Sequence, residues 1–119
     1  MFKSIRTVVY KVSDLQKAKI WYSKLLNNEP YFDEPFYVGF NINEYELGLD
    51  PSVEDVIYGT IPVAYWQVDD IVKSKSSILE MGGFLHQDIE EVGGDIKVAE
   101  FKDPFGNVIG IIEDHSFKK

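Results

Sequence analysis

Cysteine is absent from this 119-residue chain, which excludes disulfides, thiolate metal ligands and cysteine nucleophiles. No apolar run approaches the roughly 18 residues that a membrane-spanning helix needs. Residues 1–15 lack the basic region, apolar block and small-residue cleavage site of a signal peptide. We therefore expect no membrane partner and a cytoplasmic location, with which the lack of cysteine agrees.

Basic residues are also scarce. The chain has 12 Lys and Arg against 20 Asp and Glu, and its formal net charge is −8. An acidic surface repels phosphate backbones, so we expect no nucleic-acid partner. The same charge favours a cationic ligand or a basic protein, although solubility alone also accounts for it.

Common catalytic motifs are missing as well. Gly82-Gly83 and Gly93-Gly94 have the wrong spacing for a phosphate-binding loop, and a role in turns explains them. No serine stands in a nucleophile-elbow context with a following acid and histidine. The two histidines, His86 and His115, are interpreted as solvent-exposed side chains.

An internal repeat is the most informative feature that is present. With a shift of about 56 residues, Val12–Lys19 aligns with Val68–Lys75, and both segments stand where a strand meets a helix. Each copy is followed by a strand and a hairpin. We predict two βαβββ modules, residues 1–58 and 59–119, that together form one compact domain. Each module alone is too small to bury its sheet face.

Apolar periodicity and turn residues place the elements within each module. In the first module we expect a strand at 5–12, a helix capped by Ser13 with Gln16, a loop at 32–35, strands at 36–42 and 45–49, and a loop at 51–59. In the second we expect a strand at 61–68, a helix from Asp69-Asp70 to about residue 81, strands at 84–89 and 96–101 with a loop at 90–94, and a closing hairpin at 101–113.

The closing hairpin turns at Asp103-Pro104-Phe105-Gly106-Asn107, where each residue type suits its turn position. Together with Val12-Ser13-Asp14-Leu15, Trp21-Tyr22 and Val68-Asp69-Asp70, this turn resembles the vicinal-oxygen-chelate superfamily, which includes glyoxalase I, bleomycin-resistance proteins, fosfomycin-resistance transferases and extradiol dioxygenases. The resemblance implies an α+β fold in which two βαβββ modules form a curved, cup-like mixed sheet with the helices outside. It also implies a homodimer, with modules pairing within or between chains.

The resemblance further implies where metal ligands would stand. Three positions correspond to Thr7, Val63 and Gly110, the last one seven residues after the Asp of the Asp-Pro turn. A fourth corresponds to Leu47, or to Glu46 if the register slips by one residue. A divalent metal needs three or four N, O or S ligands, which these residues do not supply. We therefore expect no metal and no cofactor.

Strand alternation combined with this resemblance predicts which side chains face the cup. The candidate ligand-binding residues are Thr7, Val9, Tyr37, Leu47, Val63, Tyr65, Gln67, Val98, Glu100 and Gly110. Such a mostly apolar and aromatic lining with few polar groups is typical of a small-molecule pocket. The alternative is that these residues simply fill the cup as core.

Three functions remain open at this point. The first is a metal-independent small-molecule binding protein that resembles the bleomycin-resistance branch, with a cationic or aromatic ligand in the cup or in a dimer cleft. The second is a metal-free glyoxalase-like lyase or isomerase in which Glu100 is the candidate catalytic acid or base. The third is a structural or regulatory module that acts through its dimer surface.

Overall fold

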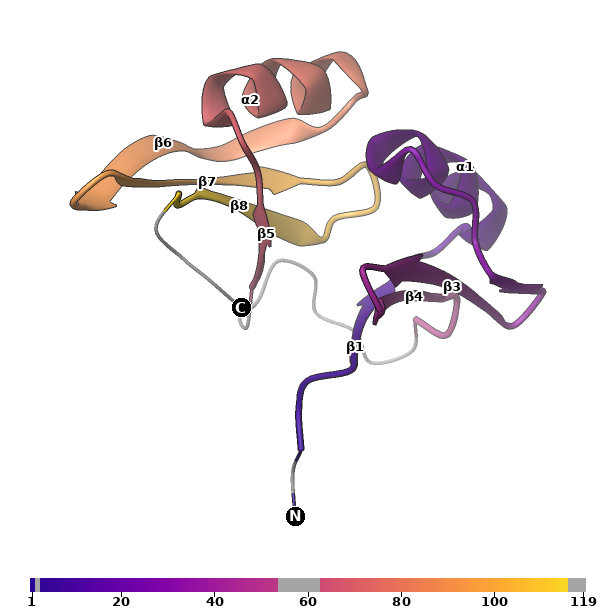
Figure 1. Cartoon of the computed structure of the whole chain (residues 1–119). Coiled ribbons are helices and arrows are strands. Elements are labelled where there is room, and N and C mark those ends of the chain that lie inside the picture. The colour runs from indigo at the N-terminus through magenta and orange to yellow at the C-terminus, as the bar shows by residue number, and fades with distance from the viewer. Residues whose placement is uncertain (2, 54–62, 116–119) are drawn as a thin grey trace. The chain divides into compact units, whose positions relative to one another are not determined.

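The computed structural model describes residues 1, 3–53 and 63–115 and divides the chain into two compact units, Met1–Val56 and Ile57–Lys119 (Figure 1). Unit 1 contains β1 (Thr7–Lys11), α1 (Leu15–Leu26), β2 (Phe32–Glu34), β3 (Tyr37–Ile42) and β4 (Tyr45–Asp50). Unit 2 contains β5 (Ala64–Gln67), α2 (Ile71–Glu80), β6 (Phe84–Gly93), β7 (Ile96–Lys102) and β8 (Val108–Glu113). The element order is βαβββ in both units, so the predicted α+β class with two βαβββ modules is confirmed.

Unit 1 is a four-stranded mixed sheet in the order β1-β4-β3-β2, with β1 parallel to β4 and the other pairs antiparallel. Helix α1 packs on β3 and β4. Fully buried side chains of this layer are Tyr22 of α1 together with Val12, Phe40, Leu47 and Leu49. This layer forms because apolar residues alternate along the strands and place one apolar face toward the helix.

Unit 2 repeats the arrangement in the order β5-β8-β7-β6, with β5 parallel to β8. Helix α2 packs on β6, β7 and β8, as Figure 1 shows. Its core contains Ile71 and Ile78 from the helix and Phe101, Ile109 and Ile111 from the sheet. The repeat seen in the sequence is therefore a repeat of supersecondary structure.

Both helices begin at an aspartate. Asp14 caps α1 by accepting a hydrogen bond from the Lys17 N–H, and Asp70 caps α2 by accepting from the N–H groups of Val72 and Lys73. The prediction that Ser13 caps the first helix is wrong by one residue. A carboxylate at this position satisfies N–H groups that have no partner within the helix.

The closing turn before β8 depends on the buried Asp103, which is only 1% exposed. Its Oδ1 accepts hydrogen bonds from the N–H of Phe105 at 2.9 Å and of Asn107 at 2.7 Å, and its Oδ2 accepts from Asn107 Nδ2 at 3.1 Å. Gly106 has φ of 97°, in the left-handed region that glycine adopts without strain. One carboxylate thus accepts from three donors of the turn, beside the backbone hydrogen bonds from the Asp103 N–H to the Asn107 carbonyl at 2.8 Å and from the Gly106 N–H to the Asp103 carbonyl at 3.2 Å.

Two segments differ from the sequence-based expectation. Phe32–Glu34, expected to be a loop, is a short strand that pairs with Tyr37–Gly39. Phe84–Gly93 is one long strand with irregular pairing, so the loop expected at 90–94 is reduced to a turn. The predicted module boundary after residue 58, most of the loop at 51–59 and the start of the strand at 61–68 fall in residues 54–62, outside the described residues. Within 3–53 and 63–115, no helix has the length and apolar character needed to cross a membrane.

Candidate functional site

Each sheet has one face covered by its helix and an opposite face, which we call the open face. In unit 1 the buried Tyr10, Phe40 and Leu47 point toward α1. Their neighbours along the strands therefore point to the open face. These neighbours include the predicted Thr7, Val9 and Tyr37.

Leu47 does not share that face. It pairs with Val8 and Phe40 and is 1% exposed beneath α1, whereas Glu46 pairs with Thr7. Of the two registers left open by the sequence, the structure thus has Glu46 beside Thr7. The assignment of Leu47 to the ligand-facing side is wrong, because a shift of one residue along a strand reverses the side to which a side chain points.

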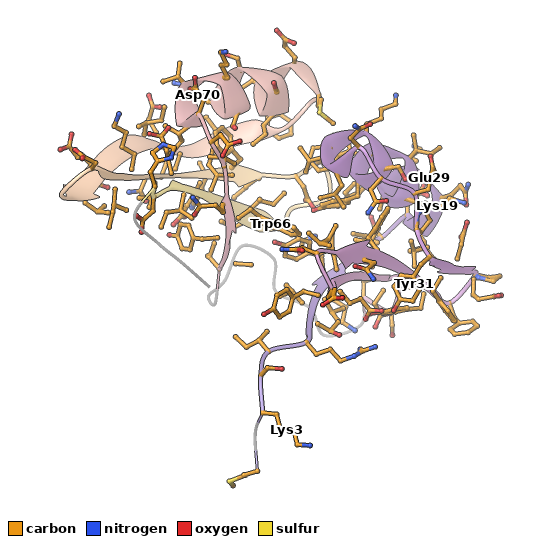
Figure 2. All side chains as sticks on the ribbon, viewed as in Figure 1. Lys3, Lys19, Glu29, Tyr31, Trp66 and Asp70 are labelled. Carbon is orange, nitrogen blue, oxygen red and sulfur yellow. The ribbon has the colours of Figure 1, made fainter. Side chains whose placement is uncertain are left out.

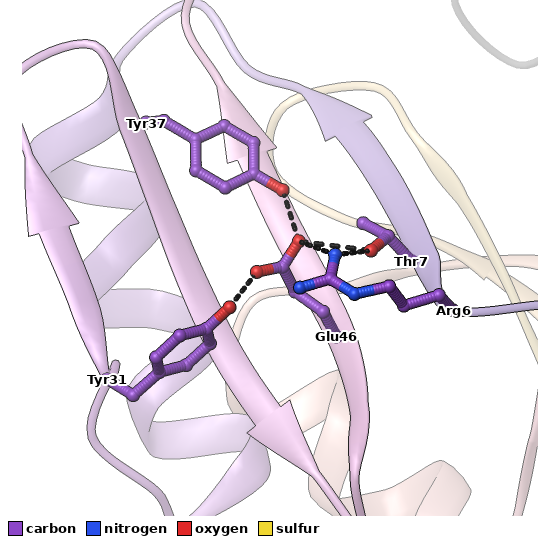
Figure 3. A network of polar contacts seen from close by, with 5 residues as sticks. All are labelled: Arg6, Thr7, Tyr31, Tyr37 and Glu46. Atoms are coloured by element: carbon purple, nitrogen blue, oxygen red, sulfur yellow. Dashed lines mark hydrogen bonds and ion pairs between the residues drawn. The ribbon is translucent and has the colours of Figure 1, made fainter.

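Glu46 is the centre of a polar network in unit 1 (Figure 3). Its Oε1 accepts hydrogen bonds from Thr7 Oγ1 at 3.1 Å and from the Tyr37 hydroxyl at 2.7 Å, and its Oε2 accepts from the Tyr31 hydroxyl. Arg6 Nη1 lies 3.7 Å from Glu46 Oε1 and donates to Thr7 Oγ1 at 2.8 Å. Four residues from two strands and two flanking segments thus converge on the carboxylate of Glu46 in β4.

The network favours the ionised form of Glu46. Burial alone would raise the pKa of its carboxyl, but the hydrogen bonds from Tyr31, Tyr37 and Thr7, with the nearby Arg6, lower that pKa below the ordinary value. Burial and the hydrogen bond to Glu46 raise the pKa of Tyr37. The hydrogen bond to Glu46 also raises the pKa of Tyr31. At neutral pH the site therefore holds a carboxylate and two neutral phenols.

A related arrangement lies on the open face of unit 2. The Tyr65 hydroxyl donates to Glu100 Oε2 at 2.6 Å, and His86 Nε2 lies 3.9 Å from Glu100 Oε1. The hydrogen bond to Glu100 raises the pKa of Tyr65. Glu100 stands between the buried Ala99 and Phe101, so its side chain points away from α2.

The tyrosine of each pair lies against a glycine of the last strand. A Cβ at Gly48 would overlap the Tyr37 hydroxyl, and a Cβ at Gly110 would overlap the Tyr65 ring. Gly48 pairs with Val9 on β1, as Gly110 pairs with Tyr65 on β5. The two glycines are thus equivalent in the repeat, and each leaves room for a tyrosine across its strand.

The remaining predicted residues of unit 2 are Val63, Gln67 and Val98. Val63 is half-buried just before β5, and Val98 is half-buried two residues before Glu100 on β7. Gln67 is exposed at the end of β5, where its Nε2 donates to the Asp114 carbonyl at 2.8 Å. The structure brings Tyr65 and Glu100 into direct contact, and it leaves the role of the other residues as a prediction.

The sequence model of the Glyoxalase/Bleomycin resistance protein/Dioxygenase superfamily matches residues 4–111. The chain belongs to this superfamily. Among curated proteins, none matches it significantly.

Solved structures of this fold resemble the chain at low sequence identity. A genomically encoded fosfomycin resistance protein, FosX, from Listeria monocytogenes has a TM-score of 0.80 at 14% identity, covering 98% of this chain and 97% of that one. Protein ATC0852 from Agrobacterium tumefaciens has a TM-score of 0.81 at 17% identity, covering 94% and 98%. A lactoylglutathione lyase from Agrobacterium tumefaciens has a TM-score of 0.74 at 18% identity, covering 96% and 97%. These likenesses show a shared fold.

The metal of the superfamily does not fit the residues of this member. Gly110 has no donor side chain, and a Cβ there would overlap Tyr65. Thr7 is engaged with Glu46, and Val63 is apolar. Within residues 3–53 and 63–115 no group of three His, Asp or Glu side chains converges as metal ligands would.

Two residues that lie close to these glutamates, Tyr31 and His86, were not predicted from the sequence. Tyr31 precedes β2 and reaches Glu46 through the length of its side chain, for which strand alternation gives no signal. His86 was expected to be solvent-exposed, which its exposed position on β6 confirms, but its approach to Glu100, with Nε2 3.9 Å from Oε1, was not predicted. The antiparallel pairing of Gln87 with Glu100 indicates this proximity, although the irregular register of β6 hides it from sequence patterns.

The lowered pKa of Glu46 predicts a pH-dependent contribution to stability. Because the folded-state pKa lies below that of the unfolded chain, the contribution is complete above about pH 4.3 and is lost as the pH falls through the folded-state value. Urea unfolding across this range is expected to show a smaller loss of stability for Glu46→Gln than for the wild type. Glu29→Gln, an exposed charge after α1, is the control. Parallel pH profiles for wild type and Glu46→Gln would contradict the prediction.

Proposed function

We propose that this superfamily member is a metal-independent small-molecule binding protein, similar to bleomycin-resistance proteins, that holds a cationic or aromatic ligand at its open sheet faces or in a dimer cleft. We further propose that it works as a cytoplasmic homodimer. The observation that carries the proposal is that both open faces present a glutamate hydrogen-bonded to tyrosine, Glu46 to Tyr37 and Glu100 to Tyr65.

The chemistry of such a pair suits a cationic aromatic compound. A partly buried carboxylate attracts a positive group, and a tyrosine ring offers an aromatic surface to stack on. The net charge of −8 adds long-range attraction for cations. One structural relative is named a fosfomycin resistance protein, so a resistance-type role is compatible with the same fold.

Titration of the chain with a panel of cationic aromatic compounds, in the presence of EDTA, tests the proposal. Trp66 stands next to Tyr65 on β5, so its fluorescence is expected to change saturably when ligand binds. Glu100→Gln is expected to weaken binding by about tenfold, as the loss of one charge-assisted contact would. Glu80→Gln at the end of α2 removes the same charge elsewhere and is expected to leave binding unchanged. No saturable response across the panel would refute the proposal.

A second function, a metal-free lyase or isomerase, is favoured by the contact of Glu100 with both Tyr65 and His86. Glu100 Oε2 accepts from the Tyr65 hydroxyl, while Oε1 faces the imidazole at 3.9 Å. A carboxylate, a phenol and an imidazole in reach of one another are the groups that general acid–base catalysis uses. Turnover that survives EDTA and is lost in Glu100→Gln would support this function over simple binding.

A further inference from the structure

We propose that the network around Glu46 in unit 1 is a subsite for a ligand that carries an amidinium, guanidinium or ammonium group on a flat aromatic body, and that Arg6 is a resident cation which the ligand displaces. This inference rests on the proposed function and specifies one of its sites.

The carboxylate of Glu46 is already oriented for a cation before any ligand binds. Hydroxyls of Thr7, Tyr37 and Tyr31 donate to it and hold both oxygens in place. Its side chain is 11% exposed. A negative charge that is oriented and partly withdrawn from water attracts a cation more strongly than an exposed one.

Two glycines make room for this arrangement. Gly39 and Gly48 pair directly across β3 and β4. A Cβ on Gly39 would lie 2.9 Å from Glu46 Oε2 and 3.3 Å from Tyr31 Cε1, and a Cβ on Gly48 would overlap the Tyr37 hydroxyl. The carboxylate and both phenols therefore lie over backbone that has no side chain. Any residue larger than glycine at either position would occupy the space of these groups.

Arg6 occupies the place next to Glu46 that a ligand cation would take, and its interaction with the carboxylate is weak. Its side chain is 74% exposed, and Nη1 lies 3.7 Å from Glu46 Oε1, beyond hydrogen-bond distance. It precedes β1 within residues 3–6, which have no regular secondary structure, and its backbone carbonyl accepts a hydrogen bond from the Glu46 N–H at 2.8 Å. An exposed ion pair of this kind contributes little, so a ligand that adds aromatic contacts can replace it.

Aromatic side chains border the site. The Phe32 ring centroid lies 6.0 Å from that of Phe36 and 6.1 Å from that of Tyr37. Phe32 pairs with Gly39, so it shares the open face with Glu46. Phe36 is 66% exposed. These rings offer apolar and π surface for the body of the ligand, and Tyr31 and Tyr37 offer it for the cation itself.

Isothermal titration calorimetry with benzamidinium, and with neutral benzamide as its uncharged match, tests the inference. Glu46→Gln is expected to weaken benzamidinium binding by about tenfold, because it removes the charge that the cation meets. Arg6→Gln is expected to tighten it by about threefold, because a competing exposed cation is lost. Neither variant is expected to change the affinity for benzamide.

Controls separate a local effect from net charge. Lys3→Gln lies in the same segment as Arg6, and Glu29→Gln follows α1; neither is expected to change the Kd (Figure 2). Because the Arg6 side chain is exposed, Arg6→Gln is expected to fold normally. It therefore tests the inference even if Glu46→Gln unfolds. Unchanged or weaker benzamidinium binding by Arg6→Gln would overturn the inference. Binding that depends on Glu100 but not on Glu46 would overturn this subsite and leave the proposed function intact. No binding of benzamidinium by any variant would overturn this subsite, and only a lack of response to the whole panel of cationic aromatic compounds as well would refute both.

Discussion

Asp103→Ala is expected to lower the free energy of unfolding by about 3 kcal/mol, because it removes a buried acceptor and leaves two part-buried backbone N–H groups without that partner. The carboxylate is 1% exposed and also accepts from the Asn107 side chain. The turn that it holds aligns β8 with β7, and β8 carries Gly110 opposite Glu100. Urea unfolding followed by circular dichroism measures the loss.

Two variants make the Asp103 prediction specific. Asp103→Asn keeps an oxygen that can accept both N–H groups and is expected to lose less than half as much stability as Asp103→Ala. Asp95→Ala removes an exposed aspartate from the turn between β6 and β7 and is expected to change stability by less than about 0.5 kcal/mol. Equal losses for Asp103→Ala and Asp95→Ala would show that the buried carboxylate is not what holds the closing turn.

Gly110→Ala is expected to destabilise the chain by about 2 kcal/mol and to weaken ligand binding, because the new methyl group displaces the Tyr65 ring from the sheet. The φ of Gly110 is not in the positive region, so the cost comes from the clash and not from the backbone. Displacement of the ring also separates its hydroxyl from Glu100. Thermal unfolding and the ligand titration measure the two effects.

A double-mutant cycle isolates the clash. In a Tyr65→Ala background the same Gly110→Ala change has no ring to displace, and it is expected to be neutral or slightly stabilising, since alanine suits a strand better than glycine. The two substitutions should therefore be strongly non-additive. Additive effects would mean that the contact of Tyr65 with Gly110 is not the reason why Gly110→Ala destabilises the chain.

Much of the fold could be predicted because local signals agreed with the repeat. Asp14 and Asp70 stand at equivalent positions where each helix begins, although Ser13 competed with Asp14 as the first cap. The Asp103–Asn107 turn combines residue types that suit it in sequence and in structure. Such signals depend on neighbours along the chain and are therefore visible without the structure.

Elements that form through long-range pairing were harder to predict. Phe32–Glu34 contains two acidic residues, which strands seldom favour, and it becomes a strand because β3 offers an edge to pair with. The strand Phe84–Gly93 continues through register shifts that break strict alternation. Local propensity does not contain this information.

The candidate site depended most on register. One residue separates Leu47, buried under α1, from Glu46, which gathers hydroxyls on the open face. The sequence left both registers open, and only the pairing of Thr7 with Glu46 decides between them. Tyr31 and His86 could not be found from alternation, since one lies outside the strands and the other on an irregular strand.

The central claim is that tyrosine-paired glutamates, without a metal, bind a cationic ligand. Its most direct test is the Kd of a cationic aromatic ligand measured by calorimetry in EDTA and again with added Zn²⁺, for the wild type and for the Glu46→Gln/Glu100→Gln double variant. We predict the same Kd for the wild type in both buffers and no measurable binding by the double variant. Binding that requires Zn²⁺, or that persists unchanged in the double variant, would contradict the claim.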